Sequence, residues 1–174
     1  AEVNEANAMA ISTISEEGIP RSRYVLFKDI VDNKLVFYSD YESSKGREME
    51  NNPNISGLFF WPELHRQIRL EGVVSKTSDE VSDNYFASRP RGAQLSAIAS
   101  SQSTEIEGRE TVEDRIKELE IEFEGKDIPR PDNWGGYAID ISFWEFWQGR
   151  RSRTHDRFIY VKNDNSWEIT RLSP

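Results

Sequence analysis

Cysteine is absent from this chain of 174 residues. Without a thiol there can be no disulfide framework, no zinc ribbon and no thiol nucleophile, and a reducing cytoplasm is the expected location. Histidine is scarce as well: His65 and His155 lie far apart in the sequence and have no neighbours at ligand spacing. We therefore expect no metal site.

Long apolar runs are also missing. The longest, such as residues 57–61, fall far short of the roughly 18 residues that a membrane span needs. The chain starts on a polar stretch without a methionine or a basic-then-apolar signal, and we expect that a segment precedes it. Basic residues number 22 and acidic residues 31, which gives a net charge of −9. This balance argues against a general nucleic-acid binder, so any anion site must be local.

Several enzyme motifs are missing too. The sequence has no Gly-x-Gly-x-x-Gly after a strand, no phosphate loop of the nucleotide-triphosphatase kind and no nucleophile elbow of a serine hydrolase. Function must therefore be sought in the grouping of other side chains.

What the chain contains is a series of short β-rich runs separated by turn residues. Runs this closely spaced, without crossover helices between them, favour an antiparallel barrel with helices on its rim. The length and the 36% hydrophobic content suit one α+β domain over residues 1–174. The expected strands are 7–14, 22–30, 34–39, 55–61, 64–76, 137–141, 143–148, 157–162 and 166–171.

Helix signals interrupt this pattern. A serine cap at Ser43 opens the first predicted helix, and a capping box of Thr77 and Glu80 opens the second. Ile116, Leu119 and Phe123 recur at helical spacing and predict an amphipathic surface helix. The expected helices are 43–51, 77–88, 92–100 and 111–124.

Arginine clusters are the informative feature of an acidic chain. Residues 147–157 hold four arginines and one of the two histidines. A guanidinium binds phosphate oxygens in pairs, so this density indicates an anionic partner. The alternative is a solvated, arginine-rich turn. The neighbouring Phe146 and Trp147 favour a site for a flat anionic ligand.

Other polar groups could join such a site. Arg21 and Arg23 share one face of a strand, and Lys28 would point the other way unless a bulge or twist intervenes. Serines and Lys45 at a helix start form an anion cradle, although Ser43 alone would serve as a cap. The alternative for each group is ordinary exposed surface. The further candidates are Ser39, Ser44, Arg47, Gln67, Tyr85, Arg89, Arg91, Gln102 and Ser103.

At this point the chain resembles the pyridoxamine-phosphate oxidase family. The resemblance rests on collinear strings such as Arg-Tyr-Val-Leu-Phe-Lys at 23–28, Ser-Arg-Pro at 88–90 and Glu-Phe-Trp-Gln-Gly at 145–149. It implies a split β-barrel homodimer with FMN at the subunit interface. It also implies a vitamin B6 enzyme that oxidises pyridoxine or pyridoxamine 5′-phosphate with dioxygen to pyridoxal 5′-phosphate and hydrogen peroxide. The other matching strings are 37–39, 52–53, 66–67, 85–91, 102–103, 134–136, 153–157 and 171–174.

The resemblance also assigns residues. In the family pattern Lys45 and nearby hydroxyls hold the flavin phosphate, whereas Lys28, Tyr85 and Arg89 hold the substrate phosphate. Arg153 and His155 are the catalytic pair, which positions the C4′ carbon of the substrate against flavin N5 for hydride transfer. The FMN residues are Arg23, Tyr24, Val25, Leu26, Phe27, Lys28, Tyr38, Ser39, Ser44, Lys45, Gln67, Gln102, Ser103, Trp147 and Arg157. The substrate residues are Lys28, Tyr85, Arg89, Arg153, Thr154 and His155.

The chain departs from the family pattern in three places, and two other functions are alternatives. Ser44 stands where the family commonly has arginine, and Ala93 stands where a serine usually assists the substrate phosphate, a hydrogen bond worth about 1 kcal/mol. The helix and lid that precede the first strand in the family are absent from this sequence. The alternatives are a flavin- or pyridoxal-phosphate-binding module without turnover, and a related oxidase of another flat anion such as a phenazine precursor.

Overall fold

The computed structural model describes residues 3–164 and 166–174, which form two compact units. The first, here the sheet unit, comprises the residues up to 37, residues 48–75 and the residues from 138 onward. The second, the helical unit, comprises residues 38–47 and 76–137. Strands β4 and β7 each run from one unit into the other.

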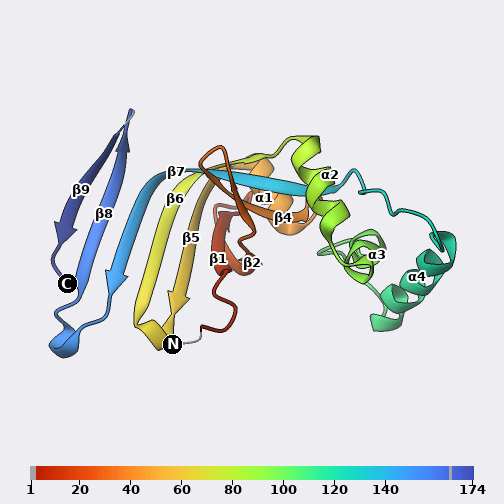
Figure 1. Cartoon of the computed structure of the whole chain (residues 1–174), viewed down its shortest axis with the longest axis horizontal. Coiled ribbons are helices and arrows are strands. Elements are labelled where there is room, and N and C mark those ends of the chain that lie inside the picture. The colour runs from red at the N-terminus through yellow and green to blue at the C-terminus, as the bar shows by residue number, and fades with distance from the viewer. Residues whose placement is uncertain (1–2, 165) are drawn as a thin grey trace. The chain divides into compact units, whose positions relative to one another are not determined.

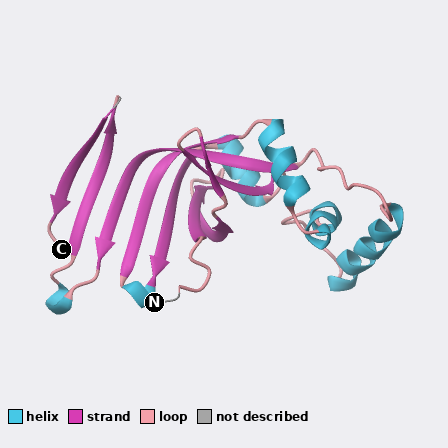
Figure 2. Ribbon diagram, in the orientation of Figure 1, coloured by secondary structure: helices cyan, strands magenta, loops and turns pink. Residues whose placement is uncertain are grey.

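One antiparallel sheet organises the strands (Figures 1 and 2). Its order is β2-β1-β5-β6-β7-β4-β3, and β8 pairs with β7 and β9 with β8. The strand order places neighbours in sequence side by side at both ends, as a meander requires. The strands are β1 (Ala8–Ile14), β2 (Pro20–Leu26), β3 (Asp29–Val31), β4 (Lys34–Asp40), β5 (Asn54–Trp61), β6 (Arg66–Lys76), β7 (Trp134–Gln148), β8 (Asp156–Asn163) and β9 (Ser166–Leu172).

Alternation of side chains gives the sheet a buried face. In β1, Met9, Ile11 and Thr13 are fully buried, whereas the intervening residues are partly exposed. This is the period of two that an extended strand imposes. Ala10 pairs with Tyr24 on one side and with Leu58 on the other, so these residues share the opposite face.

The helical unit has its own small core. Phe86, Leu95, Leu119, Ile128 and Trp134 form a buried cluster in it. The fourth helix is amphipathic, as the sequence predicts, because it buries Leu119 in this core. The helices are α1 (Ser44–Asn51), α2 (Asp79–Ser88), α3 (Arg91–Ala99) and α4 (Arg109–Glu122), and short 3-10 segments cover Pro62–Leu64 and Arg151–Arg153.

The predicted fold class, an antiparallel split barrel with peripheral helices, is confirmed, but three local predictions were wrong. The strand expected over 22–30 is two strands, because the chain breaks between Leu26 and Asp29. The strands expected at 137–141 and 143–148 are one, β7. The second helix is capped by Ser78, whose Oγ accepts a hydrogen bond from the Val81 backbone N–H, and not by Thr77. Among the described residues, no helix is long and apolar enough to cross a membrane.

Candidate functional site

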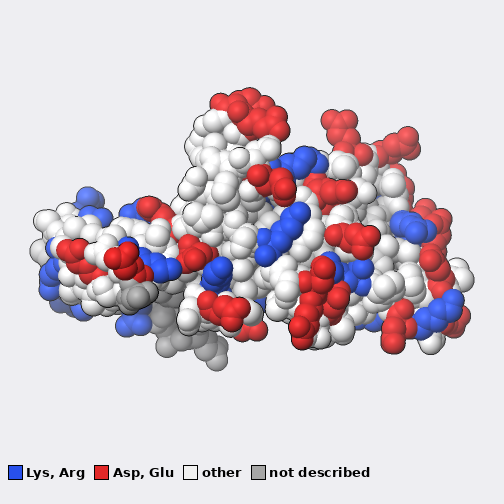
Figure 3. All heavy atoms as spheres, turned by 90° about the horizontal axis from the view of Figure 1, so that it is seen from above, with Lys and Arg blue, Asp and Glu red and all other residues white. Residues whose placement is uncertain are grey.

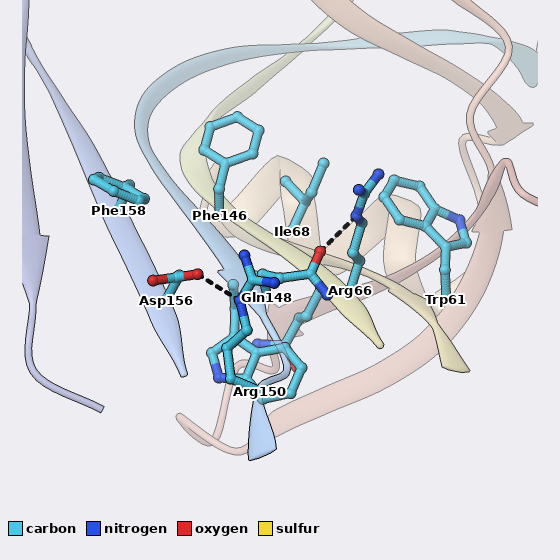
Figure 4. A pocket seen from close by; sticks show the side chains of 10 residues that line it. Trp61, Arg66, Ile68, Phe146, Gln148, Arg150, Asp156 and Phe158 are labelled. Carbon is cyan, nitrogen blue, oxygen red and sulfur yellow. Dashed lines mark hydrogen bonds and ion pairs between the residues drawn. The ribbon is translucent and has the colours of Figure 1, made fainter. Parts of the chain in front are cut away.

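A pocket of about 390 Å³ lies in the sheet unit, where β5, β6, β7 and β8 contribute side chains (Figure 4). Aromatic rings form much of its wall, and a few polar groups stand between them. The Arg66 Nε donates to Gln148 Oε1 at 2.7 Å, and the Arg150 Nε donates to Asp156 Oδ2 at 2.7 Å. Flat apolar walls with sparse polar groups suit a planar heterocycle. The lining residues are Trp61, Arg66, Gln67, Ile68, Phe146, Trp147, Gln148, Arg150, Asp156 and Phe158.

A tight turn next to this pocket carries the expected catalytic pair. Ser152 and Arg153 both have left-handed backbone conformations, with φ of 56° and 60°. Such non-glycine residues cost about 1–3 kcal/mol each, and they concentrate at functional sites. His155 stacks obliquely on Trp147 at 4.7 Å between ring centroids, and its Nδ1 accepts a hydrogen bond from the Arg150 backbone N–H at 3.1 Å. Nε2 is then the ring nitrogen that can donate a hydrogen bond.

The two arginines of β2 share a face, as the sequence predicts, and both reach one buried carboxylate. Glu48 Oε2 lies 2.8 Å from Arg23 Nη2, and Glu48 Oε1 lies 3.1 Å from Arg21 Nη1. Thr13 also donates to Glu48. Burial raises the pKa of Glu48, but the hydrogen bonds from Thr13 and Arg23 outweigh it and hold the pKa below its ordinary value.

The rest of the 23–28 segment runs from β2 into the break before β3, where the sequence predicts a continuous strand. The Phe27 backbone N–H donates to Asn7 O at 2.9 Å, and the Lys28 backbone N–H donates to Val36 O at 2.9 Å. Lys28 therefore lies in the break between β2 and β3, where the alternation of side chains in β2 no longer applies. Within β2, Tyr24 is 74% exposed and Leu26 42% exposed, whereas Val25 is half-buried.

An aromatic stack organises a second cluster, in the helical unit. The Tyr38 and Tyr85 rings are 3.7 Å apart at their centroids and nearly parallel, and Tyr38 also stacks on Trp134 at 5.7 Å. The Arg89 guanidinium lies over the Trp134 ring at 4.4 Å. Among the described residues, Arg89 Nη1 is buried and has no hydrogen-bond partner. Burial also lowers the pKa of Arg89.

Polar groups gather beside this stack, around a second pocket of about 270 Å³. Gln102 Oε1 accepts hydrogen bonds from Ser39 Oγ, at 3.3 Å, and from Lys45 Nζ. Lys45 Nζ also donates to Ser43 Oγ at 3.2 Å. Ser43 Oγ accepts the Gly46 backbone N–H, so its capping role is confirmed. The lining residues of this pocket are Asp40, Arg89, Ser96, Ala97, Ser100, Gln102 and Trp134.

The structure thus gathers the expected site residues into two groups, one in each unit. Gln67 and Trp147 line the pocket of the sheet unit, and His155 stacks on Trp147. Tyr38, Tyr85 and Arg89 meet in the helical unit through Trp134. Gln102 lines a pocket with Arg89 and Trp134 and is hydrogen-bonded to Ser39 and Lys45, so these three expected residues adjoin the second group. Elsewhere, Ser44 opens α1, Ser103 lies in a loop with φ of 70°, and Thr154 donates to the Arg151 carbonyl.

Sequence reasoning missed the acids that hold the arginines. Glu145 is 4% exposed and lies 2.7 Å from Arg157 Nε and 3.1 Å from Arg69 Nη2. Burial raises the pKa of Glu145, and the hydrogen bonds from the two arginines reverse this and lower it. A signal was available, because Glu145 is the one acid within the aromatic run 143–147. On the face shown in Figure 3, basic and acidic side chains are interleaved, in keeping with anion binding that depends on local groups.

Comparison with known structures first defines the class of fold. PhzG from Burkholderia lata 383, solved in complex with tetrahydrophenazine-1-carboxylic acid, matches with a TM-score of 0.93 and 31% identity, covering 99% of this chain and 84% of that one. A pyridoxamine 5′-phosphate oxidase-related, FMN binding protein from Nostoc punctiforme matches with a TM-score of 0.78 and 18% identity, covering 97% and 89%. The second likeness shows the fold alone. Both place the chain among the split barrels.

Sequence comparison then gives the family. Residues 1–122 match the family described as pyridoxamine 5′-phosphate oxidase, and residues 134–174 match its pyridoxine 5′-phosphate oxidase C-terminal dimerisation region. A pyridoxine/pyridoxamine 5′-phosphate oxidase from Flavobacterium johnsoniae is 51% identical over 97% of this chain and 79% of its own length. One from Leptospira interrogans is 47% identical over 99% and 81%. The chain belongs to the pyridoxamine 5′-phosphate oxidase family, and the predictions of the family and of an oxidase are confirmed.

Proposed function

We propose that this chain oxidises pyridoxine 5′-phosphate and pyridoxamine 5′-phosphate with dioxygen, and that it releases pyridoxal 5′-phosphate and hydrogen peroxide. The observation that carries the proposal is identity of about half the residues to curated oxidases of these substrates along nearly the whole chain. The chain works in the cytoplasm as one FMN-binding domain of a homodimer, and the match to a dimerisation region supports the pairing.

FMN is the proposed cofactor, and the chemistry of the side chains fits it. Gln67 and Trp147 line a pocket with aromatic walls and would hold the flat ring system. Lys45, Ser39 and Gln102 form a hydrogen-bonded group at the start of α1, where a cation and backbone N–H groups favour a phosphate. Bound FMN would supply the redox chemistry, since it takes up two electrons and passes them to dioxygen. The further FMN residues are those of 23–28 together with Tyr38, Ser44, Ser103 and Arg157.

The substrate phosphate is assigned to Arg89, Tyr85 and Lys28. A buried guanidinium nitrogen without a partner is costly, and a phosphate oxygen would satisfy Arg89 Nη1. Tyr85 lies on α2 and stacks on Tyr38, and this stacking fixes its phenol ring beside Arg89. These groups would anchor one end of the substrate.

Arg153, Thr154 and His155 are assigned to the pyridine ring of the substrate. Arg153 extends from a strained turn, and His155 is held by Trp147 and by the Arg150 backbone N–H. In this proposal Arg153 and His155 lie against the pyridine ring and orient C4′, the carbon that loses a hydride. Orientation of a bound substrate is worth several orders of magnitude in rate.

Anaerobic reduction tests the proposal. Pyridoxamine 5′-phosphate added without oxygen to the FMN-loaded protein should bleach the flavin absorbance, and admitted oxygen should restore it with release of peroxide. A flavin that stays oxidised in the presence of bound substrate would exclude turnover and leave a binding module.

The similarity to PhzG points to a second candidate substrate. That relative was solved with tetrahydrophenazine-1-carboxylic acid, a carboxylate without phosphate. Faster flavin reduction by tetrahydrophenazine-1-carboxylic acid than by pyridoxamine 5′-phosphate would favour that function. The buried, unpartnered Arg89 nitrogen favours the phosphorylated substrate.

A further inference from the structure

A buried acid lies on the sheet face that carries three of the proposed FMN residues. Glu145 and Trp147 are two residues apart on β7 and therefore share a face. Trp147 pairs directly with Arg157 of β8. From the other side, Arg69 of β6 contacts Glu145, and Gln67 is two residues before it on the same strand face. Glu145 thus stands among Gln67, Trp147 and Arg157 without belonging to the expected set.

The nitrogens of Arg157 are divided between two acceptors. Its Nε donates to Glu145 Oε1 at 2.7 Å, and its Nη1 donates to the backbone carbonyl of Ser173 at 3.2 Å. These two bonds fix the plane of the guanidinium, because all of its nitrogens lie in one plane. Among the residues that the structure describes, Nη2 makes no hydrogen bond, and it is left to receive a ligand.

Glu145 is itself held from the opposite side. Its Oε2 accepts hydrogen bonds from Arg69 Nε at 3.3 Å and Nη2 at 3.1 Å. The Arg69 guanidinium also lies over the Phe143 ring at 4.8 Å and pairs with Glu71. The side chain of Glu145 is only 5% exposed, whereas those of Arg157 and Arg69 are 30% and 39% exposed. A rigid, buried carboxylate therefore anchors an arginine whose other edge is accessible.

We propose that Glu145 is a positioning residue for FMN binding: with the Ser173 carbonyl, it holds the Arg157 guanidinium in the orientation that receives the flavin cofactor. The inference rests on the proposed function, in which Arg157 contacts FMN. Glu145 acts through Arg157 and does not touch the cofactor. Orienting the arginine before binding removes an ordering cost that FMN would otherwise meet.

A double-mutant cycle on FMN affinity tests the proposal. The apoprotein is titrated with FMN, and quenching of flavin fluorescence gives Kd for the unaltered chain, Glu145→Gln, Arg157→Ala and the double variant. Glu145→Gln should raise Kd about tenfold in the unaltered background and leave it unchanged in the Arg157→Ala background, since coupling energies between contacting residues reach this size. The same factor in both backgrounds would show a merely structural role and overturn the proposal, as would an unchanged Kd for Glu145→Gln alone.

The chain offers a matched control and a second variant. Glu71→Gln removes the more exposed acid of Arg69 without touching Arg157, and its Kd should stay within about twofold of the unaltered value. Deletion of residues 173–174 removes the other acceptor of Arg157 and leaves Glu145 in place. It therefore tests the orientation of the Arg157 guanidinium even if Glu145→Gln does not fold. The deletion should weaken FMN binding only when Arg157 is present, and an equal loss without Arg157 would count against the proposal.

FMN binding by the unaltered chain distinguishes a failure of the proposed function from a failure of the inference about Glu145. An unaltered apoprotein that does not bind FMN would overturn the proposed function together with this inference. FMN binding that is insensitive to Arg157→Ala would overturn the inference and leave the oxidase function standing.

Discussion

The Arg89 guanidinium lies 4.4 Å from the centre of the Trp134 ring, and its Nη1 is buried without a partner among the described residues. Trp134 is 8% exposed and belongs to the core of the helical unit, so the arginine rests on a fixed platform. A cation held on an indole face and lacking one hydrogen bond is prepared for an anion.

Replacing Arg89 should therefore weaken substrate binding. In steady-state assays at saturating FMN, Arg89→Ala should raise the KM for pyridoxine 5′-phosphate by about 10- to 100-fold, because it removes a charge-assisted hydrogen bond to the phosphate. The affinity for FMN should change little. Arg91→Ala is the matched control, because the Arg91 guanidinium donates to the Lys126 and Phe123 carbonyls near the end of α4. A similar rise in KM for both variants would remove Arg89 from the phosphate site.

The lowered pKa of Glu48 predicts how the free energy of unfolding depends on pH. Its pKa is lowered in the folded protein, so its ionised form stabilises the fold above the ordinary glutamate pKa of about 4.3, and this contribution is lost as the pH falls through the lower folded pKa. Glu48→Gln should lower the free energy of unfolding at pH 7 by about 1–3 kcal/mol and flatten its decline in acid. Urea unfolding at pH 7 and at a series of lower pH values measures both effects.

Glu17→Gln is the control for that experiment. Glu17 also faces Arg21, at 3.7 Å, but its side chain is 65% exposed. Water screens such a pair, and its removal should leave unfolding at pH 7 unchanged. Equal losses for the two variants would mean that the burial of Glu48 is irrelevant to its contribution.

The sequence predicts the fold better than the contacts of its site. Alternation and turn residues locate nearly every strand, but they predict one continuous strand over 22–30 and miss its break near Lys28. Local signals fail where two neighbouring residues could both cap a helix. Thr77 and Ser78 are both good caps, but Ser78 caps α2, and the Thr77 hydroxyl bonds to the Ser82 hydroxyl at 2.9 Å. Periodicity also cannot show that Ser142 continues one strand through to Gln148.

Pairings between distant segments are harder to predict. Arg23 and Glu48 are 25 residues apart, and Glu145 and Arg157 belong to neighbouring strands whose register is set only by folding. A motif match can assign Arg23 and Arg157 to a cofactor, but it does not reveal that each is already tied to a buried acid. The sheet register brings Glu145 to Arg157, and the placement of α1 beside β2 brings Glu48 to Arg23, so both pairings become visible only in the folded chain.

Lys45 provides a test of the cofactor cradle. Its ammonium group contacts Ser43 and Gln102 at the start of α1, where a flavin phosphate is proposed to bind. Lys45→Ala should raise the Kd for FMN by about tenfold or more, since it removes a charged donor to a phosphate. Arg47→Ala, which deletes a cation that donates to the Glu42 carbonyl, should change Kd little. Fluorescence titration of the apoproteins measures both, and equal Kd values would locate the phosphate elsewhere.

Arg153 should affect turnover more than cofactor binding. It lies in the turn that also holds Ser152 in a left-handed conformation, whereas Arg150 and Arg157 are each bonded to an acid, Asp156 and Glu145. If Arg153 orients the substrate ring, Arg153→Ala should lower kcat by about 100-fold, a typical loss for misplaced reacting atoms, and leave the Kd for FMN within about twofold. Arg151→Ala alters charge in the same turn and should preserve kcat. Stopped-flow flavin reduction under anaerobic conditions isolates the chemical step, and an equal loss of reduction rate and FMN affinity in Arg153→Ala would assign Arg153 to the cofactor instead.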